Sequence, residues 1–135
     1  MKTYIRNFSI VLCVPLLNAC GGDSPTEPAT ATPPLAKFSS IQQNVFTTTC
    51  AVSGCHNGTQ TPRLSAGSAY NNIVNVLNSA GIPYVDPGNA NNSYLYRKLT
   101  GQNISGDRMP RGRSPLSAAV TDSIKAWIDD GAANN

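Results

Sequence analysis

The feature that most limits the fold of this 135-residue chain is the segment from Cys50 to His56, whose sequence is CAVSGCH. The chain has four cysteines and one histidine. Cys13 and Cys20 stand in an N-terminal segment typical of export signals, so the folded part keeps only Cys50 and Cys55. Because the sole histidine directly follows the second of these, any fold must present two thiols and an imidazole from one short stretch of backbone.

This order of residues suits the covalent attachment of haem. Two thiols can form thioethers with the two vinyl groups, and the adjacent imidazole can then become an axial ligand of the iron. The usual signature has two residues between the cysteines, whereas this chain has four. The two extra residues would form a bulge at Ser53 and Gly54, because glycine tolerates positive φ. A small-loop disulfide with an incidental histidine stays open as an alternative. Zinc is disfavoured, because the mature chain offers two cysteines and one histidine but no clear fourth ligand.

A lone methionine is the second chemical feature. Removal of the export segment leaves Met109 as the only methionine, within the polar sequence GDRMPRGRSPLS. Thioether side chains usually fill apolar gaps, and the polarity of this loop predicts no packing role for one. Met109 is therefore expected to be the sixth ligand of a low-spin haem iron. An open or differently ligated sixth position is the alternative.

Apolar residues after Lys37 recur at helical spacing and predict several short helices. The first helix should be capped by Ser39 or Ser40, and its apolar stripe comprises Phe38, Ile41, Val45 and Phe46. The second should begin near Ser68 and end before Gly81, and its stripe comprises Tyr70, Ile73, Val74 and Leu77.

Two further helices follow. The third should end at Gly101, and it is indicated by the helical spacing of Tyr94, Leu95, Lys98 and Leu99. The fourth should be capped by Ser117 and end before Gly131, and its stripe comprises Leu116, Val120, Ile124, Trp127 and Ile128. No alternating apolar run flanked by hairpin turns is present, so the predicted fold class is all-α. The polar loops 57–67 and 101–115 should need something else to organise them.

This arrangement resembles a small class I c-type cytochrome domain over about residues 38 to 132. The resemblance rests on a helix that leads into the Cys…Cys-His site, a Met-Pro loop and a C-terminal helix with the stripe from Leu116 to Ile128. The resemblance implies a helical domain wrapped around one covalently bound haem c, with Cys50 and Cys55 as anchors and His56 and Met109 as the iron ligands. It also implies that the first and last helices cross, which would bring Phe38, Ile41 or Val45 against Ile124, Trp127 or Ile128.

The N-terminal segment predicts the location of the protein. Residues 1–19 have the basic start and short apolar stretch of a signal peptide, too short to span a bilayer. The sequence LNAC resembles the lipobox of bacterial lipoproteins, so Cys20 should be lipidated; an ordinary secretory signal is the alternative. Residues 20–36 form a Pro/Thr-rich tether, and residues 37–135 form the domain. Because Gly21 rather than Asp follows Cys20, the outer membrane is favoured over the inner one.

The predicted function is that of a single-haem electron carrier rather than an enzyme, with redox proteins of the cell envelope as its partners. A His/Met-ligated iron leaves no position for peroxide or oxygen. Removal of the export segment leaves eight basic against seven acidic residues, which argues against nucleic-acid binding. Two alternatives stay open: a haem peroxidase or gas sensor with an open sixth position, and a haem-free, disulfide-stapled structural lipoprotein. The arginines of the methionine loop could also steer an acidic partner, namely Arg108, Arg111 and Arg113.

Overall fold

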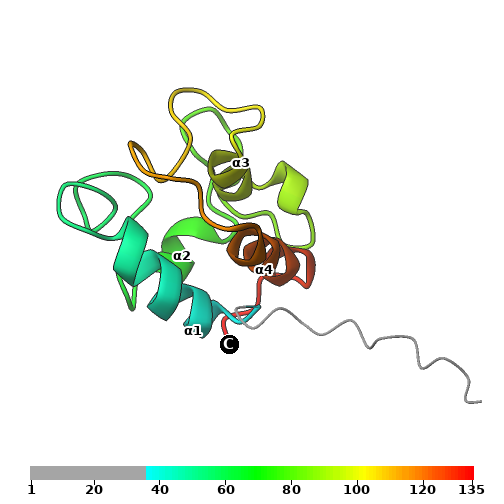
Figure 1. The fold of residues 1–135 in the computed structure, drawn as a ribbon. Helices are drawn as coiled ribbons and strands as arrows, with labels where there is room; N and C mark the ends of the chain where they lie inside the picture. Colours follow the sequence, from blue (N-terminus) through cyan, green and yellow to red (C-terminus); the bar gives the residue numbers. More distant parts are fainter. Residues whose placement is uncertain (1–35) are drawn as a thin grey trace, which may run out of the picture.

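A computed structural model describes residues 36–135 of the chain (Figure 1). The predicted signal peptide, the predicted lipidation site at Cys20 and all but the last residue of the predicted tether lie outside the described residues. Within the described residues, no helix is long and apolar enough to cross a membrane.

The described residues form a small, mostly helical domain with four α-helices and no strand. α1 (Phe38–Ile41) continues without a break into a wider π-helical segment (Gln42–Cys50). α2 (Ala69–Ile73), a short 3-10 turn (Ala90–Asn92), α3 (Tyr94–Thr100) and α4 (Ala118–Asp129) follow. The all-α prediction is thus confirmed at the level of the helical domain.

One hydrophobic core joins all four helices. The largest fully buried side chains include Trp127, Phe46, Ile41 and Ile73. The aromatic rings of Phe38 and Trp127 lie 5.5 Å apart between centroids, so the start of the first helix packs on the last helix as expected. Trp127 is 1% exposed, and its indole Nε1–H donates to the carbonyl of Ala133 at 2.9 Å. Burial of such large apolar side chains is the main stabilising term in a domain of this size.

The start of the first helix is capped differently from the prediction. Lys37 occupies the N-cap position, and no local side chain caps the helix. Asn135 does so from the other end of the chain: its Oδ1 accepts from Phe38 N–H at 2.8 Å, and its backbone oxygen accepts from Ser39 N–H at 2.8 Å. The C-terminus therefore lies beside the start of α1 (Figure 1). The prediction of a Ser39 or Ser40 cap was wrong, because a tertiary contact supplies the acceptor that a local serine would otherwise provide.

The second helix is shorter than predicted. It ends at Ile73, and Val74 is already extended. The chain then pairs with a later segment, since Asn75 N–H donates to Val85 O and Val85 N–H donates to Ile73 O, each at 3.0 Å. Leu77 is 60% exposed rather than part of a buried stripe. β-Branched valines favour extended backbone, and a long-range pairing that helical periodicity cannot show ended the helix early.

The third and fourth helices match their predicted ranges. α3 stops before Gly101, which takes the left-handed conformation (φ 79°) that glycine adopts without strain. α4 begins directly after Ser117 and ends two residues before Gly131. Ser117 occupies the N-cap position, but its side chain makes no capping hydrogen bond. The predicted position of this cap was right and its predicted chemistry was wrong.

Candidate functional site

The π-helical segment ends at Cys50, and the chain turns back on itself within the next six residues. His56 N–H donates to Cys50 O at 3.1 Å, and Cys55 N–H donates to Val52 O at 3.0 Å. Gly54 adopts φ 77°, as the bulge prediction required. The four residues between the cysteines therefore form a compact turn that keeps both cysteines and the histidine together.

The two thiols of this turn differ in their surroundings. Cys50 is half-buried and packs against the core, whereas Cys55 is exposed; both are free thiols. Burial raises the pKa of the Cys50 thiol to about 11, and the charge of Cys55 adds to the rise. The nearby Arg113 guanidinium opposes it. The disulfide alternative gains no support from this arrangement.

His56 is half-buried and oriented by one hydrogen bond. Its ring Nδ1 lies 2.9 Å from the carbonyl oxygen of Pro62. A carbonyl oxygen can only accept, so the proton is on Nδ1 and the lone pair of the neutral ring is on Nε2. Metal-ligating histidines are commonly held in this way, through the nitrogen that does not bind the metal. Pro62 could not be predicted as the partner of His56, because a backbone acceptor several residues away leaves no mark in residue type.

The loop after His56 is held by the protein itself. Leu64 N–H donates to His56 O at 2.7 Å, and Gln60 N–H donates to Cys55 O at 2.9 Å. The buried Gln42 of the π-helical segment donates from Nε2 to Leu64 O at 3.0 Å. The expectation that loop 57–67 needs an external group to organise it was therefore wrong, since hydrogen bonds fasten it to the first helix.

Met109 lies in a loop that packs on the domain. Its side chain is half-buried and contacts the hydrophobic core, and Pro110 after it is buried. The expectation that Met109 has no packing role was wrong, because its loop folds back onto α3. Met109 N–H donates to Lys98 O at 2.7 Å. The backbone of residue 109 is thereby tied to the last turn of α3, where helix carbonyls lack intrahelical partners.

The methionine loop also approaches the cysteine turn. Arg113 is close enough to Cys50 for its charge to act on the pKa of that thiol. Cys50 and Met109 both pack against the same core cluster. Among residues 36–135, no three His, Cys, Asp or Glu side chains gather into a group that could hold a metal ion. A zinc site of protein ligands alone therefore gains no support from the described part of the chain.

The arginines of α3 and of the methionine loop make structural contacts of their own. Arg97 of α3 donates to Asn91 O at 2.7 Å, away from the methionine loop. Arg108 donates to the carbonyls of Met109 and Arg113 at 3.1 and 3.2 Å. Arg111 pairs with Asp107 at 2.8 Å. Two of the three loop arginines therefore act within the loop, which weakens the argument that all three attract an acidic partner.

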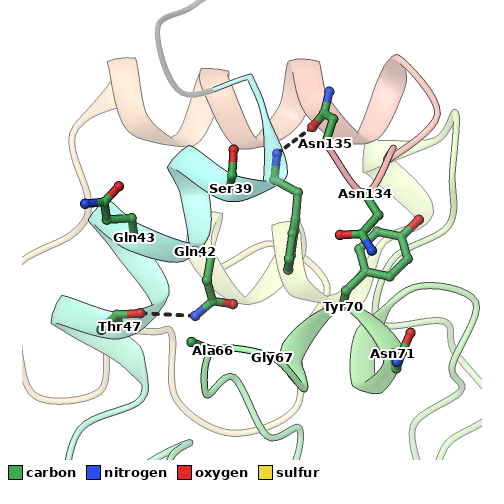
Figure 2. Close-up of a pocket in the computed structure, with 11 residues that line it drawn as sticks. Ser39, Gln42, Gln43, Thr47, Ala66, Gly67, Tyr70, Asn71, Asn134 and Asn135 are labelled. Atoms are coloured by element: carbon green, nitrogen blue, oxygen red, sulfur yellow. Dashed lines mark hydrogen bonds between the residues drawn. The ribbon is translucent and has the colours of Figure 1, made fainter.

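A surface hollow of about 500 Å³ lies away from these residues, between α1, α2 and the C-terminus (Figure 2). Its rim is formed by uncharged side chains, among them Gln43, Asn71 and Asn134. Gln42 donates to Thr47 Oγ1 at 3.2 Å at one edge, and its buried Oε1 has no hydrogen-bond partner among the described residues. None of the four residues predicted to hold the haem lines this hollow.

Comparisons of the chain with protein-family models, with curated proteins and with solved structures find no match.

Proposed function

We propose that this domain is a single-haem c-type cytochrome that carries one electron between redox partners in the bacterial cell envelope. The observation that carries the proposal is the turn from Cys50 to His56. It holds two free thiols and an imidazole whose Nδ1 is already bonded to Pro62 O, 2.9 Å away, so that Nε2 is the nitrogen left for a metal.

The donor set fits a covalently bound haem. Cys50 and Cys55 are unbridged and would form the two thioethers, His56 would be the proximal ligand, and Met109 would be the distal ligand. The mixed burial of the two thiols suits a group held between the core and the surface, since Cys50 contacts the core and Cys55 is exposed. When bound, haem iron exchanges one electron between its ferric and ferrous states.

The chain's own residues would tune that exchange. The Pro62 carbonyl fixes the ring orientation and the tautomer of His56, which makes Nε2 a better donor. Met109 as a ligand of the iron would raise its reduction potential relative to a second histidine. Packing of Met109 against the core would keep water from that side of the site. A lipid on Cys20 and a tether over residues 20–36 would hold the carrier at the membrane and leave the domain free to meet its partners.

One preparation tests the proposal. The domain is produced in a bacterial host with a c-type haem maturation system, and its mass and its ferric and ferrous spectra are recorded. The expected result is one added haem and a low-spin spectrum with a sulfur-to-iron charge-transfer band. Met109→Leu, which conserves side-chain volume, should fold and keep haem but lose the band.

The controls separate the alternatives. The double variant Cys50→Ser with Cys55→Ser should lose the covalent haem. A wild-type protein without added mass would overturn the cytochrome proposal. A high-spin wild type that binds cyanide readily would instead show an open sixth position and favour the enzyme or sensor.

A further inference from the structure

Lys98 makes three contacts with the loop that carries Met109. Its backbone oxygen accepts from Met109 N–H at 2.7 Å. Its side-chain ammonium donates to Ser105 O at 3.1 Å and also to Asp107 O. Three alternate residues of the loop are thus fastened to one residue of α3.

Arg108 and Tyr94 make further hydrogen bonds to the backbone of the loop. Arg108 donates from Nη1 to Met109 O at 3.1 Å and from Nη2 to Arg113 O at 3.2 Å. Tyr94, one turn before Lys98 on α3, accepts from Ser105 N–H at 3.2 Å. Both backbone polar groups of Met109 are therefore engaged, which limits how far its side chain can move from one position.

We propose that Lys98 is a positioning residue that holds the Met109 sulfur at the sixth coordination position of the haem iron and resists its displacement. The inference rests on the proposed function, because it concerns the same methionine. Hydrogen bonds from an ammonium to carbonyl oxygens are stronger than neutral ones. Loss of the side chain would remove its bonds to Ser105 O and Asp107 O, while α3, the bonds between the Tyr94 hydroxyl and Ser105, and the bond from Met109 N–H to Lys98 O remain.

The neighbouring residue provides a matched control. Arg97 is also a cation in the last turn of α3, but it donates to Asn91 O and to Asn92 Oδ1 instead of the methionine loop. Arg97→Met and Lys98→Met therefore remove the same charge from the same helix end, with the same effect on the helix dipole. Only the second variant removes hydrogen bonds to the methionine loop.

The experiment measures how readily Met109 leaves the iron. Added imidazole can bind the ferric haem of the full chain only when the methionine sulfur has moved away, so its apparent affinity reports the closed state of the loop. Lys98→Met should raise the imidazole affinity about tenfold, the factor that corresponds to about 1.4 kcal/mol of lost hydrogen bonding. It should also weaken the sulfur-to-iron band and lower the reduction potential. Lys98→Arg should restore all three properties, and Arg97→Met should match the wild type.

Two results would overturn the inference: an unchanged imidazole affinity in Lys98→Met, or an equal rise in Arg97→Met. If Lys98→Met does not fold, Lys98→Gln keeps a good helix former with a shorter, uncharged end, and the same rise is expected. A wild type with haem but without the sulfur-to-iron band would refute methionine ligation itself, which distinguishes failure of the proposed function from failure of the Lys98 inference.

Discussion

The cap at the start of α1 allows a direct test of a contact between the two ends of the domain. In Asn135→Ala, Phe38 N–H loses its acceptor at 2.8 Å, while Ser39 N–H keeps the backbone oxygen of residue 135. Removal of one N-cap side chain costs about 1 kcal/mol. For a domain of this length, that loss corresponds to a fall in Tm of about 5 °C. The bond is shown as a dashed line at Asn135 in Figure 2.

The assay is urea and thermal unfolding, followed by the fluorescence of Trp127, which is the only tryptophan of the chain and is buried. Asn135→Asp should retain the cap, because a carboxylate accepts the same bond and suits the positive end of a helix. Asn134→Ala changes an exposed neighbour and is the control. Ser39→Ala should leave stability unchanged. A loss in Ser39→Ala together with none in Asn135→Ala would refute the capping argument.

Three further predictions concern the thiol, the core and the loop. In the haem-free protein, burial raises the pKa of the Cys50 thiol from 9.0 to about 11. Its contribution to stability is therefore present below pH 9 and lost as the pH rises toward 11. Urea titrations between pH 9 and pH 11 should show that the free energy of unfolding falls by about 2–3 kcal/mol more in the wild type than in Cys50→Ser. An equal fall in both proteins would contradict the raised pKa of the Cys50 thiol. Ile128 is 0% exposed, so Ile128→Ala should lower the free energy of unfolding by about 2–5 kcal/mol in the same titrations. Leu77 is 60% exposed, so Leu77→Ala should leave the free energy of unfolding almost unchanged. Gly101→Ala places a side chain on a residue with φ 79° and should lower the free energy of unfolding, measured by calorimetry, by about 1–2 kcal/mol. An unchanged Tm would show that the backbone at residue 101 relaxes to another conformation.

Some of the site could be predicted from residue type and spacing. Cys50, Cys55 and His56 are adjacent in the chain, so their proximity needs no tertiary information. Their orientation does, since the acceptor for His56 is the carbonyl of Pro62. Every residue carries a carbonyl, so nothing in the identity of residue 62 marks it as the partner.

The surroundings of Met109 could not be predicted from residue type. Its scarcity in the chain indicated a special role, but the prediction that it has no packing role was wrong, because the loop folds onto α3 and the core. Nothing in the identity of Lys98 marked it as a residue that holds the loop, because its position contributed only to the spacing that predicts the third helix. Its role depends on carbonyls of residues 105 and 107 reaching the same side chain.

The sequence by itself determined the helical class of the domain, the ranges of the third and fourth helices, and the clustering of two thiols with the histidine. These features depend on local periodicity, on glycine at a helix end and on neighbours along the backbone. Tertiary structure alone decided that Asn135 caps α1, that α2 ends at Ile73 and that Lys98 holds the methionine loop. Each of these results from a backbone group that meets a partner outside its own helix, and such pairings are selected by the packing of the whole domain rather than by the residues on either side.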